Sequence, residues 1–301
     1  MKTVRRKIKM KTVIFLGDLG NQMTTYCLYK EISKKYDIKA IFTYPNQLEK
    51  IFNLKINENK DKNIYHENNF KLIKKILDFF KIIYRDSRYE GESIEQLVND
   101  KKVYYYCGCW YPVDLIKKNY EEIIQDFIFP IFEDEKNLKI KDKIEETNSI
   151  SLHIRRGDYL GHTLFGGICG EEYYQNAIGI ILNKVKNPVF FIFSNDIEWC
   201  KKNLNIDYPS YYIDWNKGEE SFRDMQLMSL CKHNIIPNSS FSWWGAWLNK
   251  NNNKIVIAPK NWINESYENF WKKGLDFLRK ITFRKKYEEY KEIVPNEWLK
   301  I

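Results

Sequence analysis

Metal-binding and redox motifs are scarce in this 301-residue sequence. Its six cysteines form no CxxC pair, and His66, His162 and His233 lack the spacing of zinc or iron ligands. The acidic run at 133–135 lies in a charged connector and does not follow an apolar strand, so it is not read as a manganese-binding carboxylate motif. We therefore expect reduced thiols and a site that works without a metal ion or cofactor.

Long apolar runs and phosphate-loop motifs are also missing. No segment approaches the roughly 20 apolar residues of a membrane-spanning helix. The run at 13–16 is too short for a signal peptide, and Asp18 soon interrupts it. No Gly-Lys-Ser/Thr follows Gly17 and Gly20, and the third glycine of a dinucleotide fingerprint is absent. The sequence therefore predicts a cytoplasmic protein without a P-loop.

The composition favours a folded protein with an anionic partner. Hydrophobic residues make up 44% and aromatic residues 16% of the chain, which is enough for a sizeable core. A chain of this length accommodates two domains. The net charge of +9 suits a nucleotide, a nucleic acid or an acidic membrane surface, and charge alone does not choose among them.

Apolar runs alternate with helical patterns, which indicates an α/β protein. Polar loops follow the runs at 12–16, 149–154, 189–193 and 234–236. In open parallel sheets, ligands bind just outside the carboxyl ends of the strands, so these loops are the candidate site. The Lys/Asn/Glu-rich stretches 55–75 and 133–148 are interpreted as surface connections between two sheet domains that face a cleft.

Two adjacent arginines, Arg155 and Arg156, follow the second of these runs. A planar guanidinium matches a phosphate with two parallel hydrogen bonds. Gly157 lets the backbone turn sharply, and Asp158 can hold one arginine from behind. A solvated arginine–aspartate pair explains the same residues equally well, so both interpretations stay open.

Three further motifs each allow a ligand-binding and a structural interpretation. Asn21 can present its amide to a phosphate or sugar oxygen, although a plain strand-to-helix turn is favoured there. Asp224 can accept two hydrogen bonds from guanine, but with Ser221 it also fits a capping box, which the sequence alone favours. Ser239 and Ser240 open an aromatic helix, where they can bind an anion or cap the helix.

Taken in order, these motifs resemble glycosyltransferase family 11, the α-1,2-fucosyltransferases. The resemblance is carried by Gly-x-Leu-Gly-Asn-Gln-Met at 17–23, His-Ile-Arg-Arg-Gly-Asp-Tyr at 153–159, Phe-Ile-Phe-Ser-Asn-Asp-Ile-Glu-Trp at 191–199 and the long stretch 224–248. It is thin between 35 and 103 and resumes near the last residues. One departure is Asp18, which stands where the family usually has glycine.

The resemblance implies an α/β fold of the GT-B type, with two Rossmann-like domains facing a cleft. An acceptor-side domain is expected at 1–147 and a GDP-sugar-binding domain at 148–301. The implied enzyme is a galactoside α-1,2-fucosyltransferase that is inverting and metal-independent. Its implied partners are GDP-fucose and a galactose-terminated glycan, fucosylated at O-2 in the biosynthesis of a surface polysaccharide or lipopolysaccharide.

The same resemblance implies roles for individual residues. Arg155 and especially Arg156 would grip the donor diphosphate, and Arg156 would stabilise the charge on departing GDP. Asp158 is a candidate general base, His153 would lie by the nucleotide, and Asp224 would read guanine. The remaining expected donor contacts are Asn21, Ser239 and Ser240.

Alternatives remain at the level of the sequence. The motifs address GDP and phosphate rather than the fucose ring, so another GDP-sugar or another linkage fits them too. A basic nucleic-acid-binding protein fits the net charge, but no recognised motif of that class is present and we expect no nucleic acid. The basic, aromatic stretch 268–291 is either a helix packed on the core or a peripheral contact with an anionic membrane, at the cytoplasmic face of the inner membrane.

Overall fold

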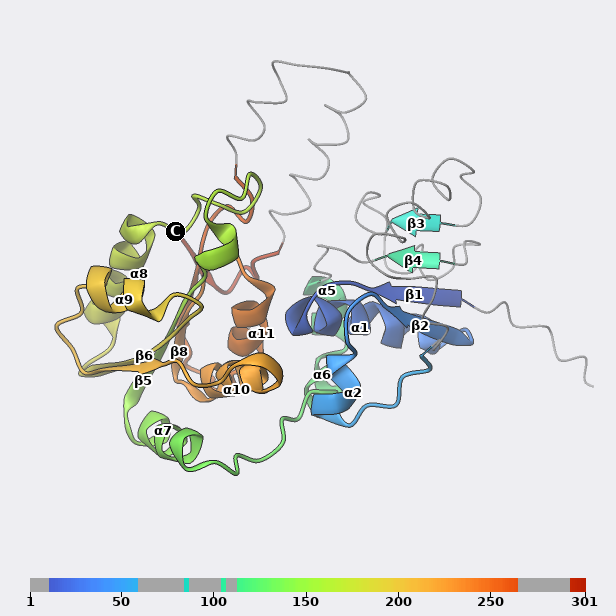
Figure 1. The fold of residues 1–301 in the computed structure, drawn as a ribbon, viewed down its shortest axis with the longest axis horizontal. Helices are drawn as coiled ribbons and strands as arrows, with labels where there is room; N and C mark the ends of the chain where they lie inside the picture. The colour runs from blue at the N-terminus through green and yellow to red at the C-terminus, as the bar shows by residue number, and fades with distance from the viewer. Residues whose placement is uncertain (1–10, 59–83, 87–103, 107–112, 265–292) are drawn as a thin grey trace, which may run out of the picture. The chain divides into compact units, whose positions relative to one another are not determined.

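Two units make up the chain in a computed structural model that describes residues 11–58, 84–86, 104–106, 113–264 and 293–301. The units are Met1–Ile128 and Phe129–Ile301, and each has its own parallel sheet (Figure 1). The stretch 268–291, for which a membrane contact is one interpretation, lies outside the described residues.

The N-terminal unit is built on a four-stranded parallel sheet in the order β2-β1-β4-β3. Every residue of β1 is buried, as expected for a strand that has neighbouring strands on both sides. The described elements are β1 (Lys11–Phe15), α1 (Leu19–Ser33), β2 (Ile38–Phe42), α2 (Gln47–Phe52), β3 (Tyr84–Asp86), β4 (Tyr104–Tyr106), α5 (Val113–Lys118) and α6 (Tyr120–Asp126).

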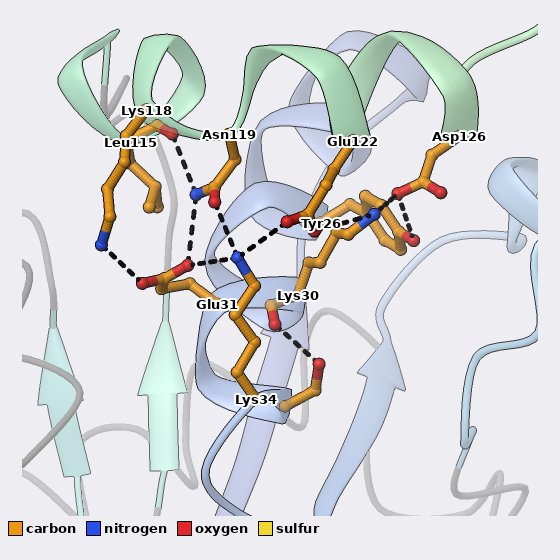
Figure 2. A network of polar contacts seen from close by, with 10 residues as sticks. Tyr26, Lys30, Glu31, Lys34, Leu115, Lys118, Asn119, Glu122 and Asp126 are labelled. Carbon is orange, nitrogen blue, oxygen red and sulfur yellow. Dashed lines mark hydrogen bonds and ion pairs between the residues drawn. The ribbon is translucent and has the colours of Figure 1, made fainter.

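A polar network ties α1 to α5 and α6 within this unit (Figure 2). Glu31 of α1 accepts hydrogen bonds from Lys118 Nζ at 3.1 Å and from Asn119 Nδ2 at 3.2 Å. Tyr26 donates its hydroxyl to Asp126 Oδ2 at 3.0 Å. Burial, and then the Asp126 carboxylate, raise the pKa of Tyr26 above its ordinary value, so Tyr26 stays a donor. The network fixes which face of α1 the two short helices cover.

The C-terminal unit contains a six-stranded parallel sheet in the order β10-β9-β8-β5-β6-β7. The chain fills one half of the sheet outward from β5 and then returns to fill the other half from β8. This order is that of the dinucleotide-binding Rossmann fold, whose ligands bind where the order reverses. The strands are β5 (Asn148–Ile154), β6 (Pro188–Ser194), β7 (Ser210–Ile213), β8 (His233–Ile235), β9 (Val256–Ala258) and β10 (Leu299–Lys300).

Helices cover both faces of this sheet, α8 and α9 on one and α7 and α10 on the other (Figure 1). Leu152 of β5 packs on the α8 face, whereas Phe191 and Phe193 of β6 pack on the α7 and α10 face. The helices are α7 (Glu135–Glu146), α8 (Glu171–Lys184), α9 (Ile197–Asn203), α10 (Phe222–Leu230), α11 (Ser240–Leu248) and the short 3-10 turns η1 (Gly157–Tyr159) and η2 (Gly218–Ser221).

The stretch 133–148 differs from the surface connection that its composition suggests. It contains α7, whose narrow apolar stripe buries Ile140 and Ile144 against β6 and α10. Because these contacts lie inside the C-terminal unit, the units divide between Ile128 and Phe129. The sequence placed this boundary later, at 147/148.

Across the part of the chain that the structure describes, no helix combines the length and the apolar character needed to cross a membrane.

Candidate functional site

The loop after β5 holds the arginine pair in two separate ion pairs. Arg155 faces Asp158, with its Nε 2.8 Å from Oδ1 and a terminal nitrogen donating to Oδ2 at 2.9 Å. Asp158 therefore does support one arginine, as the sequence suggested. Both of its oxygens face that guanidinium, and its role as a general base stays a prediction.

Arg156 is oriented by residues that follow the neighbouring strand, β6. Its Nε donates to Asp196 Oδ2 at 3.2 Å, and its guanidinium carbon lies 4.0 Å from the centroid of the Trp199 ring. Its backbone N–H donates to Asn195 Oδ1 at 3.0 Å. A Cβ on Gly157 would lie 2.5 Å from Asn195 Nδ2, so a larger residue there would displace the Asn195 side chain. A quarter of the Arg156 side chain remains exposed, which leaves donors for a ligand.

The loop after β8 brings two serines to the start of α11. Ser239 is the N-cap residue, but its hydroxyl makes no capping hydrogen bond. Among the described residues, neither serine hydroxyl is engaged in a hydrogen bond, so both can donate to an anion beside the helix N-terminus. Behind them, Trp243 and Trp244 are fully buried.

The two loops meet at the point where the strand order reverses. Tyr159 of η1 donates its hydroxyl to the carbonyl oxygen of Asn238, at 3.1 Å. Asn238 directly precedes Ser239, and its buried amide donates to the carbonyl oxygens of Phe165 and Trp262, both at 3.1 Å. The arginine pair and the serines thus flank the switch point between β5 and β8, the ligand-binding position of this sheet topology.

His153 lies beneath this edge, next to the last residue of β5. It is only 5% exposed, and its Nδ1 has no hydrogen-bond partner among the described residues. Burial, and then the nearby charge of Arg155, lower the pKa of His153 to about 3. The imidazole is therefore neutral at physiological pH. Its ring centroid lies 5.9 Å from that of Phe241 on α11.

Asp224 on α10 belongs to a different polar cluster. Its Oδ1 accepts from Asn216 Nδ2 at 2.8 Å, and Asn216 exchanges hydrogen bonds with the buried Asn137 of α7 at 2.8 and 3.0 Å. Burial raises the pKa of Asp224 to about 7, although the Asn216 hydrogen bond acts in the opposite direction. The capping box with Ser221 is not formed, since Ser221 makes no side-chain cap hydrogen bond. The capping-box interpretation was wrong: the donor to Asp224 is Asn216, which lies outside the motif.

In the N-terminal unit, Gln22 rather than Asn21 holds the loop after β1. Gln22 Nε2 donates to the carbonyl oxygens of Gly17 and Pro45 at 3.0 and 2.9 Å, and its Oε1 accepts from the Gln47 N–H at 3.0 Å. Asn21 is half-buried with no hydrogen bond from its side chain to another described residue, so its expected donor contact stays a prediction.

Asp18, the departure from the family pattern, is exposed and makes no capping hydrogen bond. Its carboxylate is therefore solvated rather than buried beside the loop.

Sequence reasoning missed the residues that position Arg156 and Asp224. Asn195, Asp196 and Trp199 follow β6, in a loop that the sequence includes in the candidate site without giving these three residues a role. Asn216 follows β7 in a stretch with no motif. The available indication for the first three was their position after an apolar strand.

No group of three or more His, Cys, Asp or Glu side chains that could hold a metal ion occurs within the described residues. Operation without a metal stays a prediction, as does the absence of a cofactor.

Comparisons with known proteins identify the class and then the family. The family model "Glycosyl transferase family 11" matches residues 1–280. An Escherichia coli protein named "Alpha-1,2-colitosyltransferase" is 35% identical over 265 residues, which cover 82% of this chain and 90% of that protein. The protein is therefore a glycosyltransferase. It belongs to glycosyltransferase family 11.

Other relatives match over shorter parts. The mouse "Galactoside alpha-(1,2)-fucosyltransferase 1" is 31% identical over 104 residues, 33% of this chain and 27% of that protein. A structure of Arabidopsis thaliana FUT1 in complex with GDP superposes with a TM-score of 0.50 at 10% identity, covering 85% of this chain and 72% of the other. This likeness concerns the fold, and the predicted α/β fold of the GT-B type is confirmed.

Proposed function

We propose that the protein transfers L-fucose from GDP-fucose to O-2 of a galactose in a glycan acceptor, with inversion at the anomeric carbon and without a metal ion. The observation that carries this proposal is Arg156 at the switch point, paired with Asp196 and stacked on Trp199, opposite the uncapped N-terminus of α11. A galactoside α-(1,2)-fucosyltransferase among the relatives supports the sugar and the linkage.

The chemistry needs positive charge where the leaving group departs. As the bond from fucose to the β-phosphate oxygen breaks, negative charge grows on GDP. A fixed guanidinium and helix N–H groups stabilise this charge without reorganising, and loss of one such contact typically lowers the rate by about 10²–10³-fold. In this proposal Arg156 and Arg155 bind the diphosphate, and Ser239 and Ser240 donate to it from the other loop.

Guanine recognition is assigned to Asp224. Its carboxylate has one oxygen fixed by Asn216, and a half-buried carboxylate favours the paired N1–H and N2 donors of guanine. Neutral His153 offers an acceptor near the nucleotide, and Asn21 contributes from the N-terminal unit. Asp158 is the candidate base for the acceptor hydroxyl, a role that requires it to release Arg155.

A second candidate is transfer of colitose, the 3-deoxy analogue of fucose, from its GDP-sugar. It is favoured by the 35% identity to the α-1,2-colitosyltransferase over most of both chains. The two donors differ by one hydroxyl. A site that hydrogen-bonds this hydroxyl rejects the deoxy donor strongly, whereas an apolar pocket discriminates weakly.

The test is product analysis with purified protein, GDP-fucose and GDP-colitose against a panel of galactosides, each with and without EDTA. Linkage is read by NMR of the product. An α-1,2-fucosylated galactoside formed in EDTA is the expected product. Colitose transfer with no fucose transfer would replace the first candidate by the second, and loss of activity in EDTA would contradict the metal-free mechanism.

Peripheral membrane binding is proposed separately, from the basic and aromatic composition of 268–291. Co-sedimentation with vesicles containing anionic lipid is the measurement, with a variant whose Lys and Arg in this stretch are replaced by Gln as the comparison. Equal sedimentation of the two proteins would reject a membrane role for the segment.

A further inference from the structure

Three aromatic side chains form a cluster in the loop between the arginine pair and α8. The ring centroids of Tyr159 and Phe165 are 5.6 Å apart, those of His162 and Phe165 are 4.9 Å apart, and those of Tyr159 and His162 are 6.4 Å apart. A linear pile would separate its outer rings much further, so the rings form a triangle. His162 is exposed, and the other two are half-buried.

The loop backbone holds these rings in place. His162 Nδ1 accepts two backbone N–H groups of the loop, both at 3.1 Å, one of them from Phe165. Asn238 fixes the carbonyl of Phe165 from the loop after β8. A Cβ at Gly166 would lie 2.6 Å from the carbonyl oxygens of Tyr159 and His162, so the loop closes this tightly only around glycine. The cluster is therefore preorganised rather than a loose surface feature.

The cluster lies next to the site already described. Tyr159 bridges to Asn238, which precedes the serines of α11, and the guanidinium carbon of Arg155 lies 5.7 Å from the centroid of the Tyr159 ring. The rings thus stand at the carboxyl edge of the sheet, between the loop after β5 and the loop after β8.

The position of the cluster indicates whether it contacts the nucleotide or the sugars. The loop continues into α8, which covers the face of the sheet formed by Leu152. Asp224 lies on α10, which covers the opposite face with Phe193. A nucleotide whose base reaches Asp224 leaves the α8 side of this edge for the sugars.

We propose that Tyr159, His162 and Phe165 form the platform on which the terminal pyranose of the acceptor glycan stacks. The apolar face of a pyranose presents C–H groups to the electron-rich faces of aromatic rings. Because Nδ1 of His162 accepts hydrogen bonds, the neutral imidazole carries its proton on Nε2, which donates to a sugar hydroxyl. This inference rests on the proposed glycosyl transfer and adds to it an acceptor contact in the C-terminal unit, whereas the sequence assigns the acceptor side to 1–147.

Two substitutions remove rings while keeping the loop. Phe165→Leu keeps apolar volume, and His162→Asn keeps a side-chain acceptor for the loop N–H groups. Tyr208→Ala, at a half-exposed tyrosine on the surface of the same unit, is the matched control. We measure KM for acceptor and donor separately, the thermal midpoint of each variant, and saturation-transfer NMR of methyl β-galactoside without donor.

Each ring variant is expected to raise the acceptor KM by about tenfold, with donor KM and thermal midpoint unchanged. Saturation transfer to the galactoside should weaken in the two ring variants and not in Tyr208→Ala. An unchanged acceptor KM overturns the platform, and a raised donor KM instead assigns the rings to the nucleotide-sugar. The protein could also bind galactoside through the rings and yet turn over no GDP-fucose. That result would support the platform and contradict GDP-fucose as the donor.

Discussion

Arg156 combines two contacts with further free donors, and a lysine cannot reproduce this combination. Its planar guanidinium pairs with Asp196, lies over the Trp199 ring and keeps further donors exposed. A lysine is a point charge without the fork of donors. For Arg156→Lys we expect kcat to fall by about 10²–10³-fold.

The control for Arg156→Lys is its thermal midpoint, which should match that of the wild type because the side chain is partly exposed. Donor hydrolysis without acceptor is a second readout. A hydrolysis rate equal to that of the wild type would show that Arg156 does not stabilise the leaving group.

Asp224 predicts a pH dependence of stability. Its pKa is raised from 3.8 to about 7 in the fold, so the folded protein holds a proton that the unfolded chain has lost in that window. The free energy of unfolding therefore decreases as the pH rises from 3.8, the ordinary pKa of an aspartate, to about 7. Above pH 7 this group causes no further change. The slope from one such proton is at most about 1.4 kcal/mol per pH unit.

Urea unfolding across this window, compared between the wild type and Asp224→Asn, isolates the effect. The difference between the two curves should fall with rising pH and then level off. A pH-independent difference would mean that Asp224 ionises in the free protein much as it does in the unfolded chain.

Local pairs at this scale could be predicted from the sequence, and distant ones could not. Arg155 and Asp158 are three residues apart, so their pairing followed from the motif itself. Arg156 and Asp196 are brought together only by the pairing of β5 with β6. The Asp224 capping box failed for the same reason, because the competing donor, Asn216, lies across a turn that carries no motif.

At the scale of elements, α11 is closed by a lysine. Lys254 Nζ donates to the carbonyl oxygens of Ala246 at 2.8 Å and Asn249 at 2.7 Å, at the C-terminal end of the helix. Positive charge is favourable there, and the unpaired carbonyls would otherwise be left without donors. Lys254→Met should lower the free energy of unfolding by about 1–3 kcal/mol.

Chemical denaturation measures this loss, with Lys250→Met at the neighbouring exposed lysine as the comparison. A surface substitution of that kind changes stability by within about 0.5 kcal/mol. If both variants are equally stable, Lys254 does not act as a cap.

Buried strands were the elements best predicted, because continuous apolar runs leave few other interpretations. β1, β5, β6 and β8 each overlap a run identified from the sequence, and each begins one residue before it. α7 was missed because only Asn137, Ile140 and Ile144 of its twelve residues are buried, so lysine and glutamate dominate its composition. A helix of this kind is recognised by a narrow stripe of apolar residues at helical spacing, not by its mean polarity.

At the scale of the whole molecule, α7 decides where the C-terminal unit begins. Ile144 is fully buried, and with Phe132 and Ile140 it packs against the apolar face of β6 and α10. Each fully buried apolar side chain of this size contributes about 1.5–3 kcal/mol. A fragment that begins after α7 exposes the part of this face that α7 covers.

We therefore expect residues 129–301 to unfold cooperatively as an isolated fragment, and residues 148–301 to aggregate or unfold at a clearly lower temperature. Within the longer fragment, Ile144→Ala should cost about 2–5 kcal/mol, since it leaves a cavity between α7 and the sheet. Calorimetry and the dispersion of amide NMR signals report both effects. Two fragments of equal stability would show that α7 is dispensable, and would return the boundary to 147/148. A stable 129–301 would place the whole supporting shell of Asp224, including Asn137, inside one folding unit.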